Sequence, residues 1–264
     1  MSQAFIGRRT YQVAGRFAEL KPRQLLAIVH LLHAKLTLLD LKMHLALVLL
    51  DARRRPLLCW QLLRMSNENR HELTKLAGFC LEEPRLTQQL LPVLRIPGRL
   101  TKLHGPASTW ANLSYGEFIQ AEGHFADYQR HPDQTRHLDQ LVATLYRPAG
   151  GDDAADCRQP YAQRDVAKRV PLVARLPLAT RLAVRMWYAS CRAAYVRKYT
   201  GTLFTSDEKN GTRPRDPREV WREILAERAG SPVHYDEYSR QLMPNIFFDL
   251  DLRIRRRQEE TPKN

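Results

Sequence analysis

Apolar residues in this chain recur at steps of three and four, the spacing that brings side chains onto one face of a helix. The clearest run comprises Leu25, Ile28, Val29, Leu32, Leu36 and Leu39. Runs that alternate apolar and polar residues between hairpin turns, as strands do, are nearly absent. The sequence therefore predicts an all-α fold, an irregular multi-helix bundle with linkers rich in Pro and Gly.

Proline, glycine and capping residues predict where the helices begin and end. Ser114 and Glu117 have the spacing of a capping box that opens a helix, and Pro148 ends another. The expected helical segments are 22–39, 41–50, 57–65, 71–81, 85–94, the helix opening at Ser114, 138–146, 165–199, 219–228 and 235–257. Residues 150–160 and 207–217 are expected to be a mobile loop and a linker, and the last residues to fray.

The stretch from Pro97 to Trp110 contains two Pro and two Gly with little periodicity, which makes it the best interior linker. We therefore expect an N-terminal helical region at 1–96 and a central and C-terminal helical body at 97–264. At 264 residues and 44% apolar content, the chain is long and apolar enough to form a proper core.

The net charge of +14 is unevenly distributed. Residues 1–100 carry 16 basic and 7 acidic groups, 101–155 carry 4 and 7, 156–200 carry 10 and 2, and 201–264 carry 12 of each. A positive field of this size favours acidic partners, nucleic acid included. However, 33 of the 42 basic residues are Arg, which a GC-rich genome could produce without selection for a ligand.

Cysteine usage and hydropathy predict a cytoplasmic protein. Cys59, Cys80, Cys157 and Cys191 are widely spaced and form no CxxC pair, so a reducing compartment is the simpler interpretation. The first residues lack the apolar core of a signal peptide. The most apolar stretch, Leu36 to Leu50, is too short and too charged to cross a membrane.

Motifs that carry chemistry are mostly missing. The sequence has no phosphate-binding glycine loop, no dinucleotide fingerprint and no nucleophile elbow, and His71-Glu72 lacks the second His of a zinc protease. Two weaker clusters are His30, His33 and His44, which share one side of a continuous helix, and Glu122, His124 and Asp127. We interpret these clusters as ordinary core-edge or solvated residues. We therefore expect no enzyme activity, no metal and no cofactor.

The most distinctive candidate site is on the segment 165–199. On a helix, one side presents Arg181, Arg185, Tyr188, Arg192, Tyr195 and Tyr199, and the opposite side carries the small or flexible residues Ala179, Ala183, Met186, Ser190 and Ala194. Guanidinium and phenol groups together suit an acidic protein helix. Alternatively, the arginines contact phosphates and the tyrosines stack on bases of a nucleic acid. Two further alternatives are a solvated basic face and a face partly neutralised by the acidic segment 101–155.

Several short phrases occur in a familiar order: Ala18 to Leu26 (AELKPRQLL), Leu113 to Ile119 (LSYGEFI), Leu145 to Pro148 (LYRP), and the long helix that ends at Cys191-Arg192 before Leu203-Phe204. Together they resemble uncharacterised tail-region proteins of Bacteroidetes phages and prophages, and they are similar to phrases of phage tail assembly chaperones. The phrases touch about half of the chain in short pieces. The chain differs from such chaperones in its basicity and its longer N-terminal helical region.

The resemblance implies a non-enzymatic helical protein of tail morphogenesis that binds a helical partner such as the tape-measure protein, in the host cytoplasm. A basic nucleic-acid-binding accessory protein is the alternative, and a small metalloenzyme has little support. From the residues themselves, we expect the LYRP phrase to be structural. Tyr146 should then be buried, with Arg147 free to cap carbonyls at the end of the preceding helix.

Overall fold

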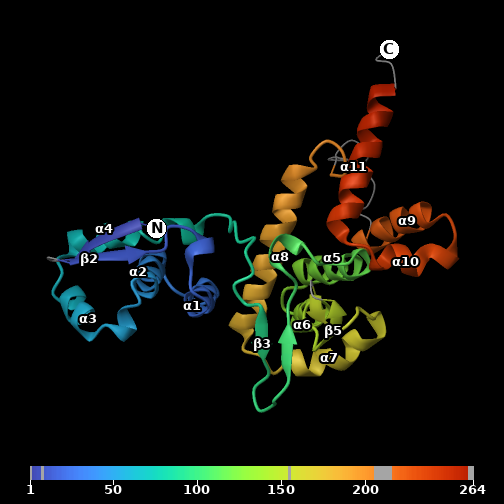
Figure 1. Cartoon of the computed structure of the whole chain (residues 1–264). Coiled ribbons are helices and arrows are strands. Elements are labelled where there is room, and N and C mark those ends of the chain that lie inside the picture. Colours follow the sequence, from blue (N-terminus) through green and yellow to red (C-terminus); the bar gives the residue numbers. More distant parts are fainter. Residues whose placement is uncertain (1, 7–8, 154–155, 205–215, 261–264) are drawn as a thin grey trace. The chain divides into compact units, whose positions relative to one another are not determined.

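The structure is a computed structural model that describes residues 2–6, 9–153, 156–204 and 216–260 (Figure 1). Its contacts divide the chain into two compact units. The first comprises Met1–Leu90 and Leu178–Ser190, and the second comprises Leu91–Pro177 and Cys191–Asn264. The division expected between residues 96 and 97 lies in a hairpin turn of the second unit.

The described residues are mostly helical, with 63% helix and 11% strand. The predicted helical character is confirmed, but the fold is not purely all-α, because the described residues also form three antiparallel hairpins. Their strands are β1 (Ser2–Ile6) with β2 (Arg9–Val13), β3 (Val93–Arg95) with β4 (Lys102–His104), and β5 (Ala149–Asp153) with β6 (Asp156–Arg158). Strands of three to five residues are too short to give a clear alternating pattern, which is why the sequence did not reveal them.

The described part of the first unit contains four α-helices and the β1–β2 hairpin, besides residues 178–190, which belong to a later helix. The helices are α1 (Pro22–Leu32), α2 (Leu38–Leu49), α3 (Pro56–Leu63) and α4 (Asn67–Lys75). Proline occupies the first helical position of α1 and α3, where no backbone N–H is needed, and the Thr37 side chain caps α2. The hairpin and three of the helices share a core that includes Ile6, Val13, Leu50, Leu58, Leu62 and Leu73.

The helix expected at 85–94 is absent, and carbonyl groups at and just before the start of this segment bond to side chains of α8 (Leu178–Lys198). Ser190 Oγ donates to the Pro84 carbonyl at 2.7 Å, and Trp187 Nε1 donates to the Thr87 carbonyl at 3.2 Å. The segment therefore satisfies its backbone through tertiary contacts rather than through a helical ladder.

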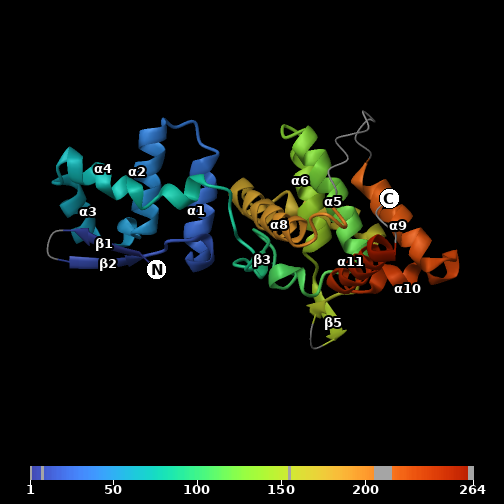
Figure 2. The same cartoon turned by 90° about the horizontal axis from the view of Figure 1, so that it is seen from above.

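The second unit is built around α5 (Tyr115–Arg130). Its other helices are α6 (Thr135–Leu145), α7 (Val166–Val173), α9 (Pro217–Ala229), α10 (Tyr235–Arg240) and α11 (Met243–Glu260). Helix α5 contacts α6, α9, α10 and α11, and Figure 2 shows the last three beside it. Gly123 permits the approach of α9, since a Cβ there would lie 1.9 Å from Arg218 Nε.

An aromatic cluster forms the centre of this unit. Phe247 of α11 lies 5.2 Å from Phe118 of α5 and 5.1 Å from Trp221 of α9, measured between ring centroids. Tyr195 and Tyr199, near the end of α8, pack edge-on against Phe247 at 5.7 and 5.8 Å. Because aromatic pairs add to the stability gained from burial, this cluster holds the C-terminal helices to α5.

The structure agrees with only some of the local features that the sequence predicts. Ser114 Oγ accepts from the Glu117 backbone N–H at 3.3 Å, which is one half of the expected capping box, whereas the Glu117 carboxylate bonds to two arginines instead of closing the box. The loop expected at 150–160 contains the β5–β6 hairpin instead. The linker 207–217 falls largely outside the described residues, as do residues 261–264. Within the described chain, no helix combines the length and apolarity needed to cross a membrane.

Candidate functional site

A buried carboxylate lies at the start of α5 in the second unit. The side chain of Glu117 is fully buried and accepts from two guanidinium groups, Arg147 Nη2 at 3.1 Å and Arg158 Nη1 at 2.8 Å. Both arginines are also buried. Since a buried charge is costly unless it is paired and hydrogen-bonded, these three side chains depend on one another.

Arg158, at the end of β6, is the most completely bonded member of this network. Its Nε donates to Asp156 at 2.8 Å, its Nη1 also reaches the Leu145 carbonyl at 3.0 Å, and its Nη2 donates to the Asn112 carbonyl at 2.9 Å. Burial lowers the pKa of Arg158, but the charges of Glu117 and Asp156 outweigh it and raise that pKa overall. Arg158 thus joins β6, the end of α6 and the segment before α5.

Arg147 is bonded less completely. Its Nη1 donates to the Gln159 carbonyl, but its Nε has no hydrogen-bond acceptor among the described residues. The hydroxyl of Tyr161 also lacks a partner there, and the Tyr161 ring centroid lies 5.9 Å from Arg147 Cζ. Burial lowers the pKa of Arg147 and raises that of Tyr161, so the phenol stays protonated and able to donate.

These groups line a pocket of about 780 Å³, which we call the arginine pocket. Its charged and hydroxyl-bearing lining includes Ser114, Arg147, Asp156, Arg158, Tyr161, Arg222, Tyr235, Asp236, Ser239 and Arg240. Arg222 and Arg240 are exposed, and neither makes an ion pair with a described carboxylate. Four arginines face two lining aspartates and the underlying Glu117, which leaves a net charge of +1.

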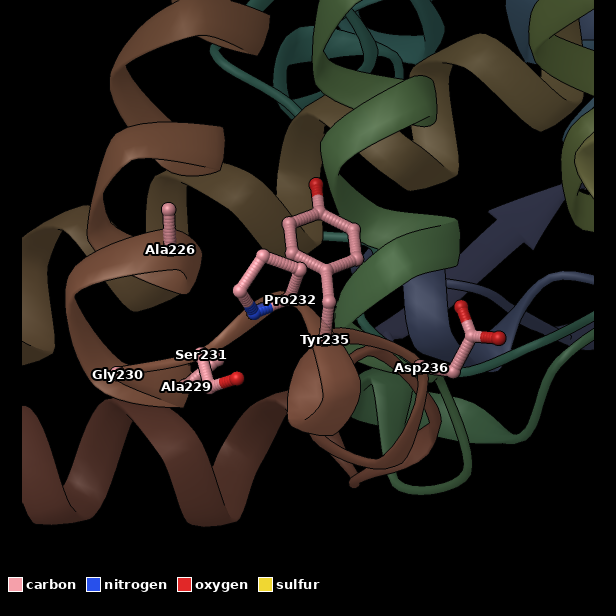
Figure 3. A pocket seen from close by; sticks show the side chains of 7 residues that line it. All are labelled: Ala226, Ala229, Gly230, Ser231, Pro232, Tyr235 and Asp236. Atoms are coloured by element: carbon pink, nitrogen blue, oxygen red, sulfur yellow. The ribbon is translucent and has the colours of Figure 1, made fainter.

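A second pocket of about 380 Å³ shares Tyr235 and Asp236 with the arginine pocket (Figure 3). Its remaining lining consists of Ala226, Ala229, Gly230, Ser231 and Pro232, from the end of α9 and the turn that follows. In Figure 3 the Tyr235 ring stands beside α5, while Asp236 points to another side of α10. Asp236 is its one charged lining residue, so this pocket offers little for an anion.

The residues expected to form one binding face on α8 differ in their exposure. Tyr188 and Tyr199 are buried, and Tyr195 is half-buried with its hydroxyl donating to the Thr109 carbonyl at 3.1 Å. Packing of Tyr195 and Tyr199 in the aromatic cluster explains why these rings are not displayed for stacking. Arg181 and Arg185 are half-buried, and a partner role for them stays a prediction.

Internal neutralisation of this face by the segment 101–155 is observed at one position. Arg192 Nε donates to the buried Glu122 carboxylate at 2.8 Å. Our interpretation of Glu122, His124 and Asp127 as a solvated face was therefore wrong, since Arg218 also donates to His124 Nδ1 at 3.1 Å and to Asp127 at 2.5 Å. These groups fix α8 and α9 to α5.

The LYRP phrase has the expected buried tyrosine, but the capping role expected of Arg147 is wrong. Tyr146 is fully buried, and its hydroxyl donates to the Leu91 carbonyl at 2.7 Å. Arg147 does not cap the preceding helix, because its guanidinium is committed to Glu117 and Gln159. Arg158 and Arg169 bond to carbonyls near the end of α6 instead.

Sequence reasoning missed the arginine pocket. Glu117 was assigned only to a capping box, and Asp156 and Arg158 to a polar loop. The usable signals were the Arg of the LYRP phrase and a Glu in the first turn of a separate helix. They do not identify the partner of either charge, because Glu117 lies 30 residues from Arg147 and 41 from Arg158.

A scan against protein-family models, a search of curated proteins and a search of solved structures each found no match to this chain. In the part of the chain that the structure describes, no group of three or more His, Cys, Asp or Glu side chains is placed to hold a metal ion.

Proposed function

We propose that this chain is a non-enzymatic binding protein whose arginine pocket accepts an acidic segment of a protein partner. The observation that supports the proposal is that two residues lining the pocket carry unsatisfied donors. The buried Arg147 Nε and Tyr161 hydroxyl have no hydrogen-bond partner among the described residues. A buried donor without an acceptor is costly, and a carboxylate that enters the pocket would relieve that cost.

The surroundings of these donors favour binding over reaction chemistry. Asp156 and Glu117, the carboxylates nearest to them, already accept from guanidinium groups, so they serve to hold the arginines in place. The exposed Arg222 and Arg240 add positive charge at the pocket. A volume of about 780 Å³ exceeds what a single carboxylate fills and suits several side chains of a peptide.

For the biological setting, we propose phage or prophage tail morphogenesis, with an acidic or helical protein such as the tape-measure protein as partner. The support is the resemblance of the AELKPRQLL, LSYGEFI and LYRP phrases. Two of these phrases supply Glu117 and Arg147 of the pocket. A tape-measure gene beside the gene for this chain, and co-purification of the two products, would be the expected result.

The pocket is tested by calorimetric titration with a capped acidic peptide of about twelve residues, mostly Glu and Ala, at low salt. Removing both exposed charges with Arg222→Gln and Arg240→Gln should weaken binding about three- to tenfold, the range for two exposed ion pairs. The fold should be unaffected, because neither side chain makes an ion pair with a described carboxylate.

The matched control is Arg175→Gln with Arg256→Gln, two exposed arginines of the same unit that do not line the pocket. Both double variants lower the net charge equally. Equal weakening in the two would show that the peptide responds to overall charge and not to the pocket.

A further inference from the structure

The β3–β4 hairpin of the second unit is a basic arm with an apolar tip. Leu94, Ile96 and Leu103 are buried, whereas Arg95, Arg99 and Lys102 are exposed. Leu100, beside the turn, is 101% exposed, the highest value among the large apolar residues described. In Figure 1 the two green strands end in a turn that extends away from the helices around them.

Hydrogen bonds close the turn of this arm and join its base to the body of the second unit. Pro97 and Gly98 occupy the central positions of a turn in which Gly98 has φ +69°, and the Arg99 N–H donates to the Ile96 carbonyl at 3.1 Å. At the base, the Gly105 N–H donates to the Pro92 carbonyl at 2.9 Å, and His104 bonds to Arg147 through both backbone groups.

The charges on the arm are not balanced internally. Arg95 and Lys102 are register partners, so their side chains stand on the same face of the hairpin. Like charges directly opposite each other destabilise a strand pair. None of Arg95, Arg99 and Lys102 makes an ion pair with a carboxylate in the described chain. Such an arrangement gains free energy when a polyanion is bound.

We propose that the β3–β4 hairpin is an arm that binds double-stranded DNA, with its cations on phosphates and Leu100 against the bases. A two-stranded ribbon fits a groove of B-form DNA, and exposed leucines of DNA-binding proteins insert between base steps as wedges. The deep, narrow major groove of duplex RNA does not admit such an element. One large apolar tip residue is too little for stable membrane anchoring. This inference is independent of the arginine pocket.

The test is fluorescence anisotropy with a labelled DNA duplex of about 20 base pairs, titrated with the full chain between about 50 and 200 mM salt. Each phosphate contact contributes about 0.9 to the slope of log K against log salt. The triple variant Arg95→Gln, Arg99→Gln, Lys102→Gln should therefore reduce the slope by about 2.7. When the salt rises from about 50 to 200 mM, the binding constant of the parent chain should fall by a factor about 40 times larger than that of the variant.

The matched control is Arg136→Gln, Arg175→Gln, Arg256→Gln, three exposed arginines elsewhere in the same unit. Either triple variant lowers the net charge from +14 to +11. Only the hairpin variant should lose slope. Leu100→Ala should weaken binding about tenfold at every salt concentration, with an unchanged slope and melting temperature, since the residue is fully exposed in the free protein.

Three results would overturn the proposal. The first is an equal loss of slope in the two triple variants, and the second is no binding of the duplex by the parent chain. The third is a hairpin variant that binds DNA as the parent chain does but no longer binds vesicles of equal parts phosphatidylcholine and phosphatidylserine. Arg222→Gln with Arg240→Gln, which tests the arginine pocket, should leave the contribution of the hairpin cations to the DNA slope intact. Failure of one proposal is therefore distinguishable from failure of the other.

Discussion

Replacing Glu117 by glutamine removes one negative charge from between two buried guanidinium groups and leaves the side chain nearly the same size. In the parent chain, Glu117 and Asp156 balance Arg147 and Arg158. After the change, two positive charges face one negative charge in a site where water is largely excluded. The folded state should lose stability, because the unfolded chain solvates both arginines equally well with either residue.

The size of the effect follows from the bonds that are lost. Glu117 accepts two charge-assisted hydrogen bonds, each contributing about 1.5–3 kcal/mol. The glutamine oxygen can keep one of them in a weaker form, because this acceptor carries no charge. A loss of about 3–5 kcal/mol is therefore expected, the range found when one partner of a buried ion pair is removed. In a chain of this size, the melting temperature should fall by about 10 °C.

Urea unfolding followed by circular dichroism measures this loss, with Glu227→Gln as the control. Glu227 is an exposed glutamate of α9 that makes no ion pair with a described residue. Its replacement should change the free energy of unfolding by less than about 0.5 kcal/mol. In addition, Glu117→Gln combined with Arg147→Gln should cost less than the sum of the single changes. A loss below about 1 kcal/mol for Glu117→Gln would refute the argument that this network stabilises the fold.

Three further changes are expected. Tyr146→Ala should lower the free energy of unfolding by about 3–5 kcal/mol, since it removes a fully buried ring and its bond to Leu91, and an unchanged melting temperature would contradict this. Burial and the nearby Arg218 lower the pKa of His124 to about 4, so the unfolded chain alone takes up a proton as the pH falls below about 6.5. Stability to urea should therefore drop by about 2–3 kcal/mol between pH 7 and 4.5, and His124→Gln should remove most of that drop. Iodoacetamide should label the exposed Cys157 in the folded chain, and Cys191, whose pKa burial raises to about 12, only after unfolding; rapid labelling of native Cys191 would be the contrary result.

Helices could be predicted where the determining signals are local. Three such signals each act within a few residues: the apolar spacing near Leu25, the cap at Ser114 and the stop at Pro148. A helix contains the first, begins at the second and ends shortly before the third. The secondary-structure predictions failed for segments whose backbone groups bond to residues far away in the sequence. In 85–94, the carbonyls of Thr87, Leu91 and Pro92 accept from Trp187, Tyr146 and Gly105 instead of from a helical ladder, and 150–160 is paired as a hairpin rather than free.

The candidate site was less predictable than the fold. Sequence spacing correctly grouped Arg192 and Tyr195 on one side of a helix, but it could not show that one binds Glu122 and the other packs on Phe247. A charge does not specify its partner in the sequence, because any of many arginines could neutralise a given carboxylate.

By itself, the sequence determined the helical content, the strong positive charge and several helix ends, since these depend on residue type and on neighbours within one or two turns. Only the tertiary structure decided which charges are buried together, which tyrosines are hidden, and that Arg95, Arg99 and Lys102 stand exposed on a hairpin. Burial and charge pairing depend on contacts between residues far apart in the chain. Such contacts exist only once the elements have packed.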